Sequence, residues 1–367
     1  LAGGLALTLA LGLVWVRGRI PAPLPGPSAE PLALRGRLVY AADVARRHQR
    51  LWVLELGTGR LRAGPRIPRA TDLVASTGGW GTWIAFLSRS PRGGVRAFVL
   101  RDLGPGARPE LVGSGDLAAW GPQATSLVLA RRGPLVDACH RAVAVVFLTV
   151  EPRSRTAVYR DPALCGDVLS VGRDQASTYF TVAARSGGGI FIPGYQRRPH
   201  PVLPGHAILS AAPTGRMLVA PLDRRPGRGG IGPWGARADR DPPPPSVAGP
   251  AAVWSGVGRP APVALGPDRL VVGRVLAWSP SASRALVVGV LHDLLGVFAL
   301  DTSADAADRS PRLVTELRGA VGATFSRDGT ALIAMGGRLY AVREGGLRDV
   351  PLPEGAPVPS GPVVWLP

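Results

Sequence analysis

Two cysteines and five histidines are the side chains of this 367-residue chain best suited to redox, metal or acid–base chemistry. The histidines are scattered through turn-like segments, at His48, His140, His200, His206 and His292. Cys139 and Cys165 have only His140 close to either of them in sequence, whereas a structural zinc site needs four grouped ligands. We therefore expect no metal site and no cofactor.

The acidic residues give no stronger indication of catalysis. Asp301, Asp305 and Asp308 resemble a calcium loop, but the central glycine and closing glutamate of that motif are missing, so a solvated loop is expected. His292 and Asp293 are adjacent in a turn-like segment, and no G-x-S-x-G sequence is present. The chain also lacks lysine and asparagine, which excludes Schiff-base chemistry, a P-loop lysine and N-glycosylation. No catalytic residue is predicted.

The charge of the chain is strongly basic. It contains 43 arginines and 25 acidic residues, which gives a formal net charge of +18. An excess of this size predicts attraction to phosphates, anionic lipid or acidic polymers.

The elements that must position these residues are short strands in a repeating pattern. The clearest copies are "LAAWGPQATSLVLA" (117–130), "LSAAPTGRMLVA" (209–220), "LAWSPSASRALVVGV" (276–290) and "GATFSRDGTALIAM" (322–335), with weaker copies at 74–88 and 169–182. Each copy reads as an apolar strand, a polar turn and a second apolar strand, and two further strands follow in most of them. Four antiparallel strands repeated every 40–50 residues or so are typical of a β-propeller.

The repeats can be counted from one anchor residue in each. The anchors are Ser76, Trp120, Val171, Ala211, Trp278, Phe325 and Trp365. Aligning these anchors places Trp120, Ala211 and Phe325 seven residues before an equivalent leucine, and Trp278 eight residues before it, so a turn one residue longer is expected after Trp278. The count predicts an all-β, seven-bladed propeller over residues 35–367, with six or eight blades as alternatives. The Arg- and Pro-rich stretch 224–249 has no strand pattern and is expected to be a disordered insertion.

The two ends of the propeller are expected to share one blade. The first repeat supplies only three strands, from residue 36 onward, whereas the chain finishes on the strand-like "PVVWLP". A propeller ring must be closed, because a single blade cannot bury its two faces alone. The predicted closure pairs a C-terminal strand with the first N-terminal strand, and its residues are Val363, Val364, Trp365, Leu38, Val39 and Tyr40.

Two repeats carry a sequence motif that resembles a known family. "FSRDG" (325–329) and "WSP" (278–280) with Leu300-Asp301 are similar to the WD40-like propeller repeat of TolB and related exported proteins. The resemblance covers the whole propeller in architecture and these two blades in motif. It implies a propeller fold, but TolB has six blades, and a shared fold carries little functional information.

The order of strands in such a blade brings the two cysteines to the same face. Cys139 falls in the loop between the second and third strands of blade three, and Cys165 in the connection that leaves this blade. We predict a disulfide between them, which would place the protein in an oxidising compartment. Two separate buried thiols are the alternative.

The same face is expected to collect basic loop residues. A basic rim could attract an anionic partner, and the tryptophan in the insertion is a further candidate contact because no repeat explains it. The partner-binding candidates are Arg46, Arg47, Arg131, Arg132, Arg141, Arg224, Arg225, Arg228 and Trp234. A solvated, arginine-rich surface without a partner is the alternative.

The first residues suggest export. Residues 1–16 are apolar and uncharged, and they are followed by arginines and a Pro-rich spacer. We interpret residues 1–20 as a helical signal or signal-anchor segment and residues 21–34 as a linker. Cleavage and anchoring both stay open. Sixteen helical residues span about 24 Å, less than the roughly 30 Å core of a bilayer, and Arg17 and Arg19 favour a cytoplasmic flank.

Together these features predict an extracytoplasmic, monomeric and non-enzymatic binding or scaffold module of the cell envelope. Its partner would be an envelope protein or an anionic polymer or lipid surface, and sequence-specific nucleic-acid binding is not expected. The alternative is an exported propeller enzyme, such as a lactonase- or glycosidase-like hydrolase. An enzyme would need acids or histidines around the central channel, and the starts of the blades supply only His206, Asp116 and Asp167.

Overall fold

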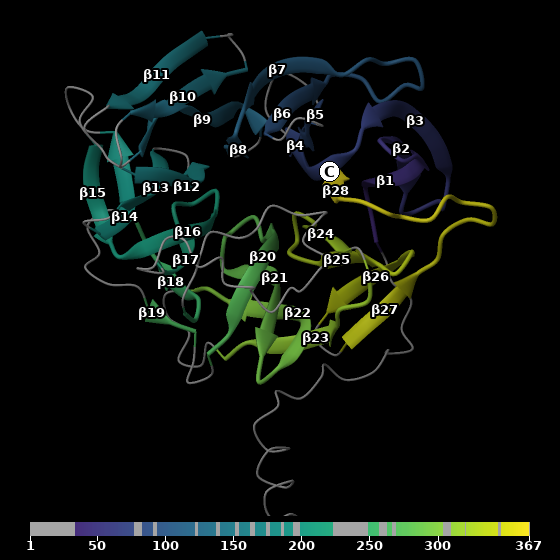
Figure 1. Cartoon of the computed structure of the whole chain (residues 1–367). Coiled ribbons are helices and arrows are strands. Elements are labelled where there is room, and N and C mark those ends of the chain that lie inside the picture. The colour runs from purple at the N-terminus through teal and green to yellow at the C-terminus, as the bar shows by residue number, and fades with distance from the viewer. Residues whose placement is uncertain are drawn as a thin grey trace, which may run out of the picture.

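The computed structural model forms a ring of seven β-sheets around a central axis (Figure 1). The residues it describes are 34–76, 83–90, 94–121, 124–136, 140–150, 154–161, 166–173, 177–184, 187–193, 199–222, 249–256, 263–265, 269–303, 310–319, 321–343 and 346–366. Within these residues 28 strands make seven antiparallel sheets of four strands each, which we call blades 1 to 7. Six- and eight-bladed arrangements are therefore excluded.

The first four blades contain the following strands, in order from the innermost strand outward. Blade 1 contains β28 (Val363–Leu366), β1 (Arg37–Ala45), β2 (His48–Glu55) and β3 (Leu61–Pro68). Blade 2 contains β4 (Ala70–Ser76), β5 (Trp83–Arg89), β6 (Val95–Leu100) and β7 (Glu110–Gly115). Blade 3 contains β8 (Leu117–Trp120), β9 (Ser126–Val136), β10 (His140–Thr149) and β11 (Ser154–Asp161). Blade 4 contains β12 (Gly166–Arg173), β13 (Thr178–Ala184), β14 (Gly187–Pro193) and β15 (Pro199–Pro204).

The remaining three blades follow the same order. Blade 5 contains β16 (His206–Ala211), β17 (Met217–Pro221), β18 (Ala252–Trp254) and β19 (Val263–Ala264). Blade 6 contains β20 (Val271–Trp278), β21 (Arg284–Leu291), β22 (Leu294–Asp301) and β23 (Arg312–Glu316). Blade 7 contains β24 (Val321–Phe325), β25 (Ala331–Met335), β26 (Arg338–Arg343) and β27 (Gly346–Val350). Every predicted anchor residue lies on the innermost strand of its blade.

The chain ends close the ring as the sequence predicts. Strand β28 pairs antiparallel with β1, with Leu38 opposite Trp365, Val39 opposite Val364 and Tyr40 opposite Val363. The indole Nε1–H of Trp365 donates to the carbonyl oxygen of Arg35 at 3.1 Å, and its backbone N–H donates to Thr324 Oγ1 of blade 7 at 3.0 Å. The closing strand is therefore bonded both to its own blade and to the preceding one.

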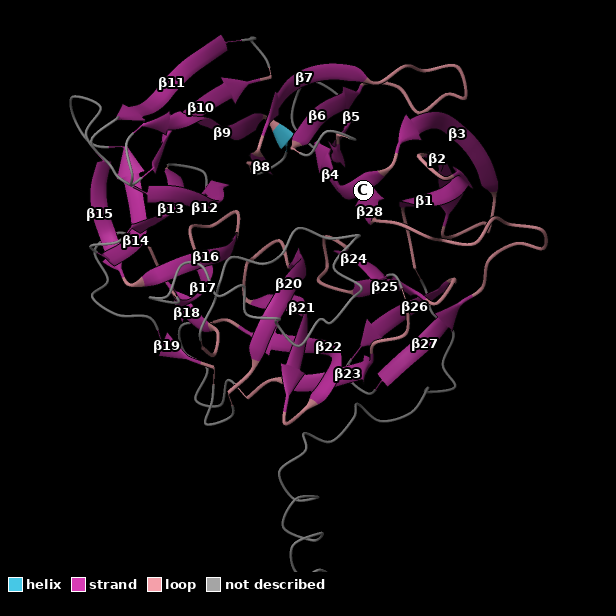
Figure 2. Cartoon of the chain, viewed as in Figure 1, coloured by secondary structure: helices cyan, strands magenta, loops and turns pink. Residues whose placement is uncertain are grey.

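The core lies between the blades rather than inside any single blade. One apolar cluster joins blades 7 and 1 around Leu38, Tyr40 and Trp365, and another joins blades 1 and 2 around Val39 and Val364. The described chain is almost entirely strand and loop, with one 3₁₀ turn at residue 124 (Figure 2). Such stacking is the expected solution for sheets that are apolar on both faces.

The repeated turn between the first and second strands explains the TolB-like motif. In blades 6 and 7 a buried serine follows the aromatic anchor, and Ser279 Oγ accepts the N–H of Arg284 while Ser326 Oγ accepts the N–H of Thr330, both at 2.9 Å. This hydrogen bond satisfies a backbone donor that the tight turn would otherwise bury. The serine of the motif is thus a structural residue.

The lengths of these turns differ from the prediction. Trp278 pairs with Ala285 and Trp120 with Leu127, each seven residues apart. Ala211 pairs with Met217 and Phe325 with Ala331, each six residues apart. Blade 3 therefore has the same longer turn as blade 6. Counting to the nearest leucine gave the wrong spacing, because alanines take the paired positions in blades 6 and 7.

Arginines at the ends of these turns connect neighbouring blades. Arg216 of blade 5 donates to the carbonyl oxygen of Ala282 in blade 6 at 3.3 Å, and Arg284 of blade 6 donates to that of Gly329 in blade 7 at 2.8 Å. Gly329 has a φ of +83°, and an added Cβ would lie 2.7 Å from the Arg284 guanidinium. Part of the arginine excess therefore has a structural role.

Several predictions concern residues outside those described. The apolar segment 1–20, nearly all of the linker and almost all of the insertion 224–249 fall in this group. The described chain begins at Leu34, whose side chain packs into the core between blades 7 and 1. No helix among the described residues is long and apolar enough to cross a membrane.

Removal of residues 361–367 should unfold or aggregate the protein. The four side chains of β28 are nearly fully buried, at 0–9% exposure. At about 1.5–3 kcal/mol for each buried apolar side chain, their loss approaches the whole stability of a domain, about 5–15 kcal/mol. Thermal unfolding followed by circular dichroism, together with size-exclusion chromatography, measures this. As a control, deletion of residues 1–33 should leave the midpoint unchanged, and a truncated ring with wild-type stability would refute the closure.

Candidate binding face

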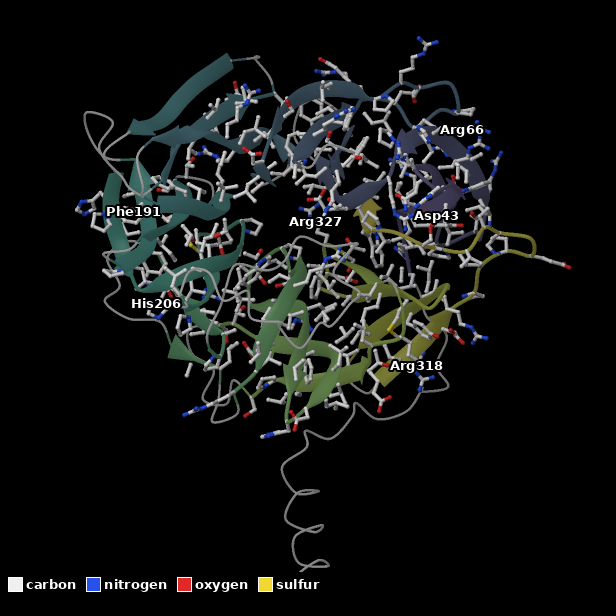
Figure 3. All side chains as sticks on the ribbon, in the orientation of Figure 1. Asp43, Arg66, Phe191, His206, Arg318 and Arg327 are labelled. Carbon is white, nitrogen blue, oxygen red and sulfur yellow. The ribbon has the colours of Figure 1, made fainter. Side chains whose placement is uncertain are left out.

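The alternation of strands gives the ring two different faces. Connections between second and third strands, and connections between blades, reach one face, which we call the hairpin face. Turns between first and second strands, and between third and fourth strands, reach the opposite face. In Figure 3 Arg327, from a first-to-second turn of blade 7, lies toward the centre of the ring, whereas Arg66 of β3 lies on the outer rim.

Two of the predicted contact residues lie on the hairpin face of blade 1. Arg46 and Arg47 form the turn between β1 and β2, and both are exposed. The base of this hairpin is tied down by Gln49, which is buried, donates to Asp43 Oδ1 at 3.0 Å and accepts the N–H of Ala70 at 3.0 Å. Asp43 also pairs with an arginine of the next connection, at 3.2 Å. These contacts hold the base of the hairpin that carries the two exposed arginines.

A groove opens on the hairpin face between blades 2 and 3. Its volume is about 320 Å³, and it is lined by Ser90, Gly94, Val95, Arg96, Ser114, Gly115, Asp116 and Arg131. The predicted contact Arg131 is exposed, and its Nε–H donates to the carbonyl oxygen of Ser114 at 3.0 Å. The apolar contacts between these two blades form two separate clusters, whereas a single cluster joins the other neighbouring blades in the described residues.

The other predicted site residues are not described in full. Arg132 and Arg141 lie on β9 and β10, in the hairpin that extends toward the hairpin face, and their side chains are outside the described set. The remaining candidates lie outside the described residues altogether: Arg224, Arg225, Arg228, Trp234, Cys139 and Cys165. The disulfide and the role of the insertion therefore stay predictions.

The hairpin face also carries apolar side chains that sequence reasoning missed. Val44 of blade 1, Leu295 of blade 6 and Val358 of the connection from blade 7 to blade 1 are large exposed hydrophobic residues, at 45%, 36% and 59% exposure. A further exposed leucine, Leu111 at 51%, lies on the outermost strand of blade 2. These apolar residues come from different blades, and arginine, the other exposed residue type of this face, is enriched at protein interfaces.

The central channel contains an acid that the sequence did not reveal. Asp72 lies on β4 directly after a bulged residue, and its Oδ1 accepts the N–H of Leu87 at 2.8 Å. Arg274, on the innermost strand of blade 6, reaches across to the carbonyl oxygen of Thr71 at 3.0 Å. Since blades 2 and 6 are not neighbours in the ring, this bond crosses the channel.

The surroundings of Asp72 shift its titration strongly. The pKa of Asp72 is raised from 3.8 to about 6, and desolvation by burial is the main cause. The hydrogen bond from Leu87 and the charge of Arg274 act in the opposite direction but are smaller, and the value of about 6 includes their effect. Carboxyls with raised pKa values are common at functional sites, although structural networks also contain them. Among the described residues, Asp72 is therefore the main candidate for acid–base chemistry.

The other histidine and acidic residues singled out from the sequence lie in turns and in the groove. His292 and Asp293 form a hairpin turn with φ values of 48° and 64°, and the Nδ1 of His206 lies 2.9 Å from the carbonyl oxygen of Pro204. Asp116 lines the groove between blades 2 and 3 rather than the channel. No group of three histidine, cysteine or acidic side chains able to hold a metal occurs among the described residues.

Comparisons with known proteins support the fold class alone. No protein-family model and no curated protein matches the chain. Among solved structures, the acylaminoacyl peptidase of Pyrococcus horikoshii is 11% identical over 89% of this chain, with a TM-score of 0.53, and the match covers 52% of the peptidase. This chain therefore spans about half the length of that enzyme. The similarity shows a β-propeller and no particular activity.

Two other propellers match with lower scores. The propeller domain of the Trilobed protease from Pyrococcus furiosus is 10% identical over 87% of this chain and 95% of its own length, with a TM-score of 0.48. A putative 6-phosphogluconolactonase from Bacteroides fragilis is 11% identical over 93% of this chain and 100% of its own, with a TM-score of 0.45. The protein is a seven-bladed β-propeller, and membership of the TolB-type repeat family stays a prediction.

Replacing Asp72 should change how stability depends on pH. A raised folded-state pKa means that the folded protein binds the proton more tightly than the unfolded chain, so stability increases as pH falls from about 6 toward 3.8. Asp72→Asn keeps the acceptor oxygen for Leu87 and removes the buried charge. The variant should be more stable than wild type at pH 7.5, by up to about 3 kcal/mol, at about 1.4 kcal/mol per pKa unit. Residual exposure of the residue makes this an upper figure.

Urea unfolding at pH 7.5 and pH 4 measures this difference. The gap between the two proteins should close at pH 4, where Asp72 is protonated in the folded state. A variant that is less stable than wild type at pH 7.5, or a gap that does not change with pH, would contradict this assignment.

Proposed function

We propose that this propeller is a non-enzymatic binding module of the cell envelope that docks an anionic protein partner on its hairpin face. The observation that carries the proposal is the composition of this face in the described residues. Exposed Arg46, Arg47 and Arg131 lie there together with large exposed apolar side chains. Arginine is enriched at protein interfaces, whose buried centres are more apolar than the surrounding surface, and positive charge steers an anionic partner to the face.

The position of the chain ends supports an arrangement relative to a membrane. Residues Leu34 to Arg37 enter blade 1 from the face opposite the hairpin face, because β1 runs from Arg37 next to Leu366 toward the hairpin turn at Arg46. If residues 1–16 anchor the protein, the hairpin face turns away from the anchoring side. It would then be presented to a protein in the surrounding compartment, and the module would act as a monomer outside the cytoplasm.

An exported propeller enzyme is the second candidate, and Asp72 is the observation that favours it. A channel carboxyl with a pKa of about 6 could act as an acid or base near neutral pH. Its Oδ1 is already engaged by a backbone N–H and Arg274 bonds the neighbouring carbonyl, which favours a structural role. Hydrolysis of a chromogenic lactone or glycoside that is lost in Asp72→Asn would favour the enzyme.

Charge reversal on one face tests the binding proposal. Changing Arg46, Arg47, Arg96 and Arg131 to glutamate should abolish retention on an immobilised polyglutamate column at about 0.15 M salt, where the screening length is about 8 Å. The matched control changes Arg60, Arg108, Arg312 and Arg327, which are exposed on the opposite face. Both variants lower the formal net charge of +18 by eight.

The control separates a binding face from general basicity. It should keep most of the wild-type retention, and circular dichroism should show that both variants are folded. Equal losses in the two variants would mean that net charge alone governs binding, and the proposed face would be wrong.

A further inference from the structure

The groove between blades 2 and 3 is formed by close approach of three backbones. Gly94 has a φ of +79°, and a Cβ there would lie 2.7 Å from the carbonyl oxygen of Gly115. A Cβ on Gly115 would in turn lie 2.7 Å from the carbonyl oxygen of Ala130 in blade 3. Larger side chains at either glycine would displace the strands that carry the lining arginines, so the shape of the groove is built into the backbone.

Two arginines of this groove converge on the same residue. Arg96 of β6 is the cross-strand partner of Ser114 on β7, and Arg131 of β9 donates its Nε–H to the carbonyl oxygen of Ser114. That bond holds the guanidinium of Arg131 against blade 2 by its Nε edge. Arg96 is exposed, and its side chain makes neither an ion pair nor a hydrogen bond with another described residue.

Two guanidinium groups beside one strand are suited to a carboxylate. Each planar fork can donate two parallel hydrogen bonds to the two oxygens of a carboxylate, which is stronger and more directional than attraction to a point charge. Among the described lining residues, Asp116 is the one acid against two arginines, so this lining favours an anion. The hydroxyl of Ser114 adds a neutral donor.

The strand that carries Ser114 also presents an apolar contact. β7 is the last strand of its sheet, and Leu111 on it has a side chain that is 51% exposed. Because β7 has a bulge between them, Leu111 and Ser114 lie opposite Phe98 and Arg96, which are two residues apart, about 7 Å along a strand. An extended peptide lying along this edge could place an apolar side chain on Leu111 and a carboxylate between the arginines.

We propose that the groove between blades 2 and 3 binds an acidic side chain of an extended protein segment whose apolar residue packs on Leu111. This inference rests on the proposed function, because it names the partner class and the site on the same face. A protein segment is favoured over a lipid headgroup because the N-terminal segment joins the propeller at the opposite face. The spacing predicts an acidic residue about two positions from an apolar one in the partner, so that both side chains lie on the same face of the extended segment.

A display library of linear ten-residue peptides, selected on the complete protein, tests the proposal. Selected peptides should be enriched in Asp or Glu two or so positions from Leu, Ile, Val or Phe. The double variant Arg96→Gln/Arg131→Gln should weaken their binding by about tenfold or more, as expected for loss of charge-assisted bidentate bonds. Leu111→Ser should weaken it by about fivefold, the effect of losing one partly buried apolar contact. Fluorescence anisotropy with labelled synthetic peptides measures these affinities.

The control double variant is Arg312→Gln/Arg327→Gln, on the opposite face of blades 6 and 7, which should change affinity by less than about twofold because exposed charges this distant are screened. Peptides with Gln for Glu should bind as weakly to wild type as the acidic peptides bind to the groove variant. Vesicles of phosphatidylglycerol form a separate arm, in which wild type and the groove variant should behave alike.

Each contrary outcome has a distinct meaning. The proposal that the groove binds an acidic side chain would be wrong if no peptide were selected, if the selected peptides were not enriched in acidic residues, or if wild type and groove variant bound them equally. Vesicle binding that depends on Arg96 and Arg131 would overturn it in favour of lipid. If charge reversal on the hairpin face still abolishes polyglutamate retention in these cases, the proposed function stands and only the groove proposal is wrong. If that charge reversal also leaves retention unchanged, the proposed function and the groove proposal are both wrong.

Discussion

The ladder between β1 and β28 is the interaction on which the rest of the molecule depends. Four residue pairs, from Arg37 opposite Leu366 to Tyr40 opposite Val363, join the two ends of the described chain. They supply the innermost strand of blade 1, and the clusters on both sides of this blade include β28 side chains. Without this strand, blades 7 and 1 would expose facing apolar surfaces and an unpaired strand edge.

Closure also determines which surfaces can be used for binding. A closed ring fixes each hairpin on one face and each first-to-second turn on the other, so basic residues from distant parts of the sequence gather together. Arg46 comes from blade 1 and Arg131 from blade 3, yet both reach the hairpin face. The same closure holds the start of blade 1 at the opposite face. The binding surface and the membrane-directed end are therefore separated by the thickness of the propeller in our proposal.

The sequence was sufficient to predict the number of blades and their closure because each blade repeats one local pattern. Apolar strands separated by Gly-, Pro- and Ser-containing turns have a physical cause that is visible within about ten residues. Turn lengths were less accessible: alanines occupy the paired positions opposite Trp278 and Phe325, and a leucine count passes over them.

The candidate site was predicted only in part, since its geometry depends on contacts between blades. The loop arginines at 46, 47 and 131 could be assigned to one face from strand order alone. The groove is formed by the close approach of Gly115 to Ala130 in the next blade. The position of Asp72 depends on a β-bulge in its strand and on an arginine from across the ring. Neither feature has a signature in a single stretch of sequence.

Hydrogen exchange of the intact protein, followed by mass spectrometry, tests the central claim of a ring closed by its two ends most directly. The account predicts that the backbone amides of Val363 to Leu366 exchange as slowly as those of β24 and β25 in the adjacent blade, because they belong to the same cooperative core. Exchange of the C-terminal amides at the rate of an exposed tail, with the other blades still protected, would contradict it.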